Sequence, residues 1–242
     1  MSRRRFFVDE VRNGQASISG EDAKHLTRVL RVERGEMYEI SDGSGKIYLA
    51  EITLAHKGEV VFDVKEAIDP KPVLVRITLL PALFKFDHFE WMLEKATELG
   101  VERVTPVIAT RSERGLEQAA GKRIERWRRI VMEASQQSRR DRVPVVDLPV
   151  KLTAALRSRH GLMLDEEGGE PLLTALPSLK QREAEMVLAL GPEGGWTPEE
   201  RTQFTASGWT RASLGSQILR AETAAIAALA IVQAAWSSGE IK

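Results

Sequence analysis

The sequence contains no cysteine and only four histidines among its 242 residues. Disulfide frameworks and the Cys/His zinc sites of small structural domains are therefore excluded. The histidines stand in unrelated contexts and no dense cluster of carboxylates accompanies them, so we expect no metal centre. The Gly-x-Ser-x-Gly motif of many hydrolases is also absent. Because nothing in the composition requires an oxidising compartment, the expected location is the cytoplasm.

A long apolar run and a net charge are missing as well. The longest apolar run, residues 224–232, is far shorter than the roughly 18 residues that span a bilayer, so we expect no membrane segment. Asp9 and Glu10 directly follow the apolar residues 6–8, which leaves no stretch long enough for a signal peptide. The 35 basic and 35 acidic side chains cancel, so a nucleic-acid surface must come from local segregation of charge.

Short apolar runs separated by turn signals dominate the first 70 residues. Residues 47–52 and 60–64 are rich in β-branched and aromatic side chains, which is typical of strands. Gly43-Ser44-Gly45-Lys46 predicts a hairpin turn rather than a phosphate-binding loop, because a strand and not a helix follows it. One amphipathic helix is expected at residues 20–31. These features together indicate a small β-barrel.

Two prolines in Asp69-Pro70-Lys71-Pro72 mark a linker, because proline resists both a helix interior and a central strand. Beyond this linker helices and strands alternate. The strands are short, nearly continuous apolar runs, as expected for a parallel sheet that is buried on both faces. We therefore predict a β-rich domain at residues 1–70 and an α/β domain with a parallel sheet at residues 71–242.

Three helices in the second domain carry informative patterns. Thr197-Pro198-Glu199-Glu200 combines a Thr N-cap with Pro at the first helical position and Glu at the third. Asp87, with Glu90 three residues later, predicts a second capping box. The last helix, from about Ala221, is apolar nearly all round, so it lies either in the core or at a subunit interface.

Two glycine-bearing loops follow apolar strands, at residues 188–200 and 214–223. Open α/β folds place ligand sites at such strand-to-helix transitions, and two loops close together indicate one pocket. The first loop matches neither the phosphate-binding nor the dinucleotide-binding motif. Glu193 at its centre would repel a phosphate, so a neutral or cationic ligand fits better. The alternative is a tight turn without a ligand.

Basic residues are concentrated between Lys122 and Arg142, where eight stand against three acidic residues. Arginine predominates there, which suits bidentate contacts with phosphate. With basic residues elsewhere, this segment predicts an RNA-binding surface assembled from both domains, and the alternative is a solvated helix face. The candidate RNA contacts are Arg3, Arg5, Arg28, Arg31, Lys85, Arg111, Arg114, Arg139 and Arg140.

Several motifs occur together along the chain. They are residues 25–31, 95–101 and 133–144, the segment Leu190-Gly191-Pro192-Glu193-Gly194-Gly195, and Leu214-Gly215 with Ile218-Leu219-Arg220 and Glu222-Thr223-Ala224. With them the sequence resembles, nearly from end to end, the RsmE-type ribosomal RNA methyltransferases of the SPOUT (trefoil-knot) superfamily. This family usually has Arg, Thr and Phe where this sequence has Gln217, Ala221 and Trp196.

The resemblance implies a PUA-like RNA-binding barrel at residues 1–70 and a knotted α/β methyltransferase domain at residues 71–242. It also implies S-adenosylmethionine (SAM) as cofactor, a homodimer, and methylation of N3 of a uridine in 16S ribosomal RNA, within the 30S subunit or its precursor. The implied cofactor-binding residues are Leu164, Leu190, Gly191, Pro192, Glu193, Gly194, Gly195, Leu214, Gly215, Ile218, Leu219 and Thr223.

The chemistry of that reaction assigns three candidate catalytic residues. Methyl transfer from a sulfonium is an in-line displacement, and the N3 proton of uracil must leave. Glu193 or Glu222 would accept this proton, and Arg220 would stabilise the imide anion. In the alternative, Glu222 caps the last helix and pairs with Arg220. Two other functions stay open, a SPOUT methyltransferase for tRNA or another base, and a non-catalytic RNA-binding or ribosome-assembly factor.

Overall fold

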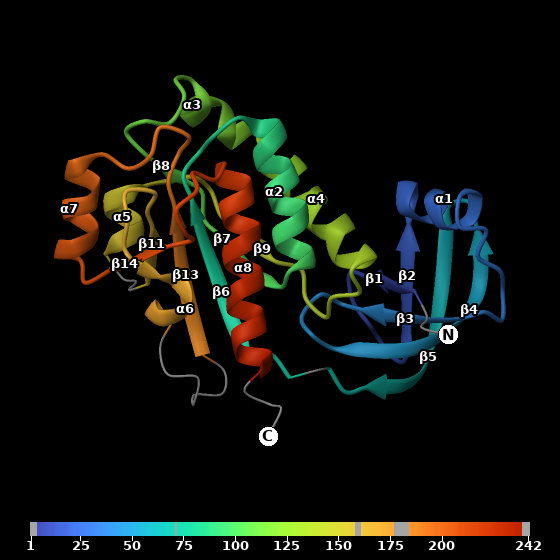
Figure 1. Ribbon diagram of the computed structural model, residues 1–242. Helices are drawn as coiled ribbons and strands as arrows, with labels where there is room; N and C mark the ends of the chain where they lie inside the picture. Colours follow the sequence, from blue (N-terminus) through green and yellow to red (C-terminus); the bar gives the residue numbers. More distant parts are fainter. Residues whose placement is uncertain (1–3, 71, 158–160, 177–183, 239–242) are drawn as a thin grey trace. The chain divides into compact units, whose positions relative to one another are not determined.

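A computed structural model describes residues 4–70, 72–157, 161–176 and 184–238 (Figure 1). The chain divides into two compact units. The first extends to Pro72 and takes in a second segment, Ser135–Val143, whereas the second contains Val73–Ala134 and the chain from Pro144 onward. The predicted division near residue 70 does not include this returning segment.

The first unit is built on a five-stranded sheet in the order β1-β3-β4-β5-β2. β1 and β3 pair in parallel, and the other neighbours pair antiparallel. Register shifts between β4 and β5 accompany the curl of the sheet (Figure 1), which agrees with the predicted barrel-like domain. The elements are β1 (Arg5–Phe7), β2 (Gln15–Ser19), α1 (Gly20–Arg28), β3 (Met37–Ser41), β4 (Ile47–His56) and β5 (Glu59–Ile68).

Apolar side chains from these strands and from α1 form the core of the first unit. Ala23 and Leu26 of α1 are buried in the same cluster as Phe62 of β5. The helix ends at Arg28, three residues earlier than predicted, and Arg31 adopts a left-handed φ of 52°. The side chain of Arg31 therefore belongs to a turn and not to the helix.

Arg5 explains why Ser135–Val143 belongs to the first unit. Its side chain is 9% exposed and pairs with Glu39 at 2.8 Å and with Asp141 at 2.5 Å. The guanidinium also donates to the Arg139 carbonyl at 2.8 Å. Because a buried charge is stable only when it is paired, the returning segment completes the surroundings of β1.

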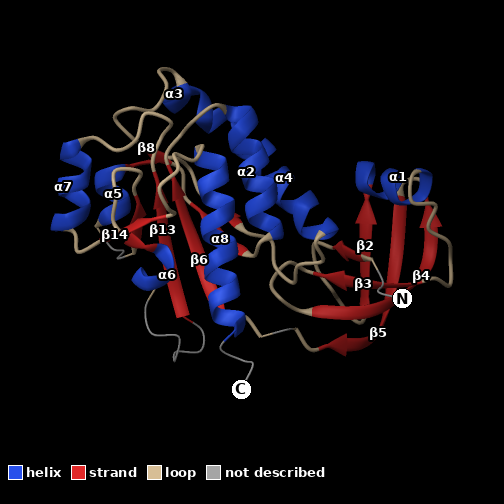
Figure 2. Ribbon diagram, viewed as in Figure 1, coloured by secondary structure: helices blue, strands red, loops and turns tan. Residues whose placement is uncertain are grey.

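The second unit is organised around a seven-stranded sheet in the order β12-β14-β11-β13-β6-β7-β9, in which every pair is parallel. Figure 2 shows its central strands β6 and β13 side by side. The predicted α/β class with a parallel sheet is confirmed. The strands are β6 (Val75–Pro81), β7 (Val101–Val104), β9 (Val145–Val146), β11 (Leu162–Leu164), β12 (Glu170–Pro171), β13 (Ala184–Leu190) and β14 (Thr210–Ser213). β8 (Val107–Ile108) and β10 (Val150–Lys151) form a separate pair.

Helices cover both faces of this sheet. α8 lies along β6 and β13 and packs against α2 (Figure 1). Leu79 and Leu80 of β6 point to opposite faces and are both fully buried, so neither face is open to solvent. The helices are α2 (Phe86–Glu98), α3 (Leu116–Ala120), the 3-10 helix η1 (Gly121–Arg123), α4 (Ile124–Gln137), α5 (Leu152–Leu156), α6 (Leu172–Ala175), α7 (Pro198–Ala206) and α8 (Ala221–Ser238).

Two helix starts test the capping predictions. The box at α7 is confirmed, because Thr197 Oγ1 accepts from the Glu200 N–H at 3.2 Å and Glu200 Oε2 accepts from the Thr197 N–H at 2.9 Å. The predicted box at Asp87 is wrong. α2 begins at Phe86, after the N-cap residue Lys85, so Asp87 is the second helical residue and cannot be the N-cap.

None of the helices in the described part of the chain is both long and apolar enough to cross a membrane.

Candidate functional site

Three neighbouring strands of the parallel sheet end at one edge, and the loops that follow them enclose a cavity. β11 ends at Leu164, β13 at Leu190 and β14 at Ser213. Open α/β sheets bind ligands at such a carboxyl edge. This three-loop cavity contains about 630 Å³ of empty space, including its open mouth. It is lined by Leu164, Asp165, Glu166, Leu190, Gly191, Pro192, Glu193, Gly195, Trp196, Leu214, Gly215, Gln217, Leu219, Ala221 and Ala224.

Two glycines on this wall allow neighbouring side chains to approach the backbone closely. A Cβ on Gly195 would lie 2.1 Å from Glu166 Oε1, and one on Gly191 would lie 3.3 Å from Trp196 Nε1. Gly195 also has a left-handed φ of 67°, which glycine adopts without strain. The path of the loop after β13 therefore depends on glycine.

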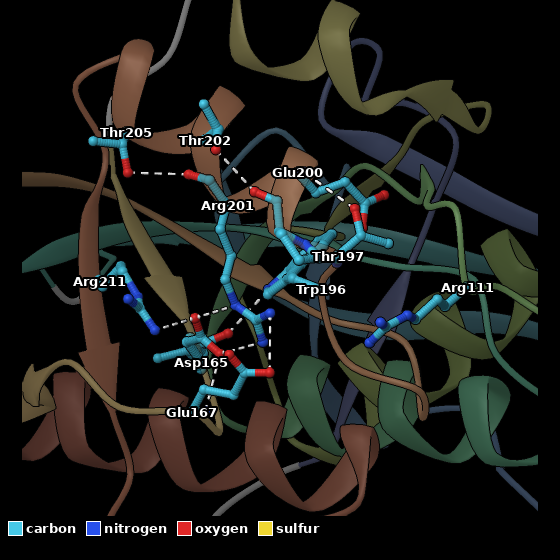
Figure 3. Close-up of polar contacts among 12 residues, drawn as sticks. Arg111, Asp165, Glu167, Trp196, Thr197, Glu200, Arg201, Thr202, Thr205 and Arg211 are labelled. Carbon is cyan, nitrogen blue, oxygen red and sulfur yellow. Dashed lines mark hydrogen bonds and ion pairs between the residues drawn. The ribbon is translucent and has the colours of Figure 1, made fainter.

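Trp196 ties two of the loops together. Its side chain is 1% exposed, and its Nε1 donates to the Leu164 carbonyl at 3.1 Å (Figure 3). The ring packs edge-on against Phe204 of α7, with 4.9 Å between the ring centroids. The indole thus fixes the end of β11 relative to the loop after β13, and it gives the cavity an apolar wall.

A buried ion-pair network holds the loop after β11 (Figure 3). Asp165, whose side chain is 0% exposed, accepts from Arg201 at 2.8 and 3.0 Å and pairs with Arg211 at 2.8 Å. Burial alone would raise the pKa of Asp165, but the hydrogen bonds from Arg201 and the Glu167 N–H, together with the positive charges of Arg201 and Arg211, outweigh burial and hold the pKa below its usual range. Asp165 therefore stays ionised at neutral pH and anchors the loop after β11.

The start of α7 is fastened to the segment after β8. Glu200 is 4% exposed, and its Oε1 accepts from the Thr110 N–H at 2.8 Å while its Oε2 completes the capping box. Arg111 donates to the Gly194 carbonyl at 2.8 Å, and its side chain reaches towards the loop in Figure 3. These bonds hold the loop at residues 191–196 through Gly194 and fix the start of the helix that follows it.

The structure places most of the predicted cofactor residues on one wall. Of the twelve, all but Gly194, Ile218 and Thr223 line the three-loop cavity. Ile218 is 82% exposed, and Thr223 is exposed on the first turn of α8. Gly194 does not line the cavity and lies against the aliphatic part of the Arg111 side chain.

The loop after β11 contributes two further wall residues, Asp165 and Glu166, which the sequence did not lead us to predict. A signal was present, since the apolar strand β11 is followed within a few residues by Gly168-Gly169, as the other two strands are followed by glycines. The wall also includes Trp196, Gln217 and Ala221, the positions that depart from the RsmE pattern.

The three predicted catalytic residues do not share one site. Glu193 is exposed and lines the three-loop cavity. Glu222 is 5% exposed and lines a different hollow between α2 and α8, where its Oε1 lies 2.8 Å from His88 Nδ1. Arg220 is exposed at the start of α8.

The contact with Glu222 changes the titration of His88. It raises the pKa of His88, although burial and the nearby Arg220 oppose this shift. The alternative pairing of Glu222 with Arg220 is wrong for the described residues, because the carboxylate turns to His88 instead. Glu222 Oε2 is buried, and no residue in the described part of the chain forms a hydrogen bond with it.

The candidate RNA contacts differ in their exposure. Arg3 lies outside the described residues. Arg5 is turned inward and held by two carboxylates, so it is not available to a phosphate. Arg140 is half-buried. The exposed group consists of Arg28, Arg31, Lys85, Arg111, Arg114 and Arg139.

The basic segment along α4 is largely paired within the protein. Glu90 of α2 forms ion pairs with Arg123 at 3.2 Å and Arg126 at 2.8 Å. Two further arginines of α4 pair with glutamates three or four residues away on the same helix. The excess of charge in the sequence therefore overstates the positive charge that this helix presents to solvent.

Family models match both units of the chain. Residues 70–233 match an RNA methyltransferase domain, and residues 18–65 match an RNA methyltransferase PUA domain. The chain is 33% identical over 236 residues to the ribosomal RNA small subunit methyltransferase E of Synechocystis, which covers 95% of this chain and 76% of the relative.

Solved structures show the same similarity. The ribosomal RNA small subunit methyltransferase E from Neisseria gonorrhoeae, bound to SAM, has a TM-score of 0.87 and 30% identity, over 97% of this chain and 98% of that one. A putative methyltransferase from Legionella pneumophila, in complex with SAM, has a TM-score of 0.86 and 29% identity over the same shares. The chain therefore belongs to the family of the ribosomal RNA small subunit methyltransferase E proteins.

Proposed function

We propose that this protein transfers a methyl group from SAM to N3 of a uridine in 16S ribosomal RNA. The observation that carries the proposal is the three-loop cavity, which lies at the carboxyl edge of a parallel sheet and is lined by residues of both glycine-bearing motifs. Relatives of similar fold over nearly the whole chain have been solved with SAM bound, which supports SAM as the ligand.

The residues of the cavity fit this cofactor chemically. Leucines 164, 190, 214 and 219 and the indole of Trp196 offer an apolar surface to an adenine ring. Glycine-containing backbone brings amides and carbonyls close to a ligand without side-chain obstruction. Glu166 and Glu193 add negative charge, which suits the positive sulfonium and ammonium groups of SAM and would repel a phosphate.

When bound, SAM supplies an electrophilic methyl group. The protein must align the acceptor with that methyl group and remove the N3 proton of uracil. Of the two carboxylates considered, Glu193 lies on the cavity wall and Glu222 does not, so we assign the proton to Glu193. Arg220 begins the turn that carries Ala221 and Ala224 on the wall, and it would stabilise the imide anion, a role often worth about 3 kcal/mol.

The exposed basic residues form the proposed RNA-binding surface. Arg28 and Arg31 belong to the PUA-like unit, whereas Arg111 and Arg114 follow β8 in the methyltransferase unit, where Arg111 donates to the Gly194 carbonyl of the loop at residues 191–196. N3 lies on the Watson–Crick edge of uracil, so the target base must be unpaired or flipped out before it can react.

We further propose a homodimer, a trefoil knot formed by the three loops, and a cytoplasmic site of action on the 30S subunit or its precursor. The dimer is supported by α8 and its neighbour α2, since Ala230 of α8 is exposed and Trp91 of α2 is 47% exposed. A strictly monomeric species in sedimentation would contradict the dimer.

Nucleoside analysis tests the function. We expect 30S subunits from a strain that lacks the gene to contain no 3-methyluridine, and purified protein with SAM to restore it. Glu193→Gln should lower the rate by about 100-fold or more, the usual weight of a general base. Glu133→Gln, on the exposed side of α4, should not. Unchanged 3-methyluridine in the deletion strain would refute the proposal, and loss of a methylated tRNA nucleoside would favour the tRNA alternative.

A further inference from the structure

Three consecutive carboxylates, Asp165, Glu166 and Glu167, follow β11 and carry the chain past the three-loop cavity. They do not have the same surroundings, and Figure 3 shows two of them, Asp165 and Glu167, beside Arg201. This difference determines which of the three negative charges acts on a ligand in the cavity.

Asp165 and Glu167 are neutralised by arginines. Asp165 is fully buried between Arg201 and Arg211, with contacts of 2.8 to 3.0 Å. Glu167 is paired with the remaining guanidinium nitrogen of Arg201 at 3.1 Å. Together these two carboxylates and two guanidiniums sum to zero charge.

Glu166 is not paired in this way, and Arg201 acts on its charge only at longer range. It is exposed, lines the three-loop cavity, and forms no ion pair with any residue that the structure describes. Its carboxylate lies against the backbone of Gly195 on the opposite loop, since a Cβ there would come within 2.1 Å of Oε1. The carboxylate is therefore directed across the wall and not away from it.

From this geometry we propose that Glu166 makes the cavity selective for the positively charged sulfonium of SAM over the neutral thioether of the product, S-adenosylhomocysteine. The inference rests on the proposed function, because it assumes SAM as the ligand. A carboxylate on the wall stabilises a cation more than a neutral group of the same shape. Such a difference would favour exchange of spent cofactor for fresh cofactor.

Glu166 has one other plausible role, which predicts a different result. A carboxylate can accept hydrogen bonds from hydroxyl groups such as those of a ribose. The two cofactor forms have the same ribose and the same amino-acid end, so a hydroxyl contact would contribute equally to both. Only an interaction with the sulfonium distinguishes them.

Isothermal titration calorimetry with the full-length protein separates these roles, with SAM and S-adenosylhomocysteine as the two probes. For Glu166→Gln we expect the Kd of SAM to rise about fivefold, which corresponds to one charge pair screened nearly as in water. The Kd of S-adenosylhomocysteine should change by less than about twofold. Glu167→Gln is the matched control, because it removes a neighbouring charge that is already paired, and it should leave the ratio of the two constants unchanged.

Several outcomes overturn the inference. Equal weakening of both ligands by Glu166→Gln would assign a hydroxyl contact, and unchanged affinities would remove Glu166 from the site. If Glu167→Gln or Glu193→Gln weakens the binding of SAM selectively and Glu166→Gln does not, the charge that selects SAM belongs to another residue. If the wild-type protein binds neither probe, the proposed function fails with it, whereas the other outcomes leave that function intact.

Discussion

Replacing Arg201 by Met tests whether the ion pair behind the three-loop cavity stabilises the protein. The substitution removes the two hydrogen bonds to Asp165, at 2.8 and 3.0 Å, and the contact with Glu167 at 3.1 Å. The side chain of Arg201 is only 11% exposed and that of Asp165 is 0% exposed, so water cannot readily replace the lost donors.

The size of the stability loss depends on the contacts that Asp165 retains in the variant. Removing one partner of a buried pair costs about 3–5 kcal/mol when the other charge is left alone. Asp165 retains Arg211 at 2.8 Å and the Glu167 N–H at 3.1 Å, so we expect a smaller loss of about 2–3 kcal/mol. For a chain of this length that corresponds to a fall in Tm of roughly 4–12 °C.

Thermal unfolding at pH 7 measures this loss, and Arg129→Met provides the matched control. Arg129 pairs with Glu133 at 3.5 Å with both side chains about 70% exposed, so its removal should cost less than about 0.5 kcal/mol. Equal effects of the two substitutions would refute the reasoning. Because the pKa of Asp165 is lowered in the folded state, the stability from ionised Asp165 is present above about pH 4 and lost as the pH falls further. The difference between wild type and Arg201→Met should shrink accordingly.

Two further substitutions give distinct signatures. Gly195→Ala should lower Tm by a few degrees, because it adds about 1 kcal/mol of strain at a left-handed φ and forces Glu166 aside. An additional Glu166→Ala should restore only the part of the stability that is lost through the clash with Glu166. An unchanged Tm for Gly195→Ala would contradict the contact. His88→Gln should destabilise the protein more at pH 6 than at pH 9, since the raised pKa of His88 gives a stabilisation that is present below about pH 6.5 and lost as the pH rises through the folded value. Equal losses at both pH values would exclude an ionic contact with Glu222.

Local signals predicted the parts of the site that are local in the chain. The capping box at Thr197 and the glycines of the loop after β13 require particular residues within a few positions, so the sequence alone indicates them. Asp165 and Glu166 face the same cavity because β11 lies between β13 and β14 in the sheet. That strand order is a property of the whole fold, and no local pattern contains it.

Long-range pairs give two of the predicted site residues partners that their sequence neighbours do not indicate. Arg5 was assigned to the RNA surface because it belongs to a basic cluster, yet its partner Asp141 lies 136 positions away. Glu222 was assigned to the catalytic site because it neighbours a cofactor motif, yet it turns to His88, 134 positions away. In both cases a side chain was assigned from its sequence neighbours, while the fold supplied a partner of opposite charge.

The returning segment Ser135–Val143 also sets the order in which the protein can be completed during translation. A ribosome makes Arg5 well before Asp141, so β1 leaves the exit tunnel before the second carboxylate for its guanidinium exists. In that interval Glu39 is the one acidic partner already synthesised, and a buried charge short of partners is costly. The PUA-like unit, although it starts first, therefore finishes folding only after the chain has passed through residues 73–134 of the methyltransferase unit.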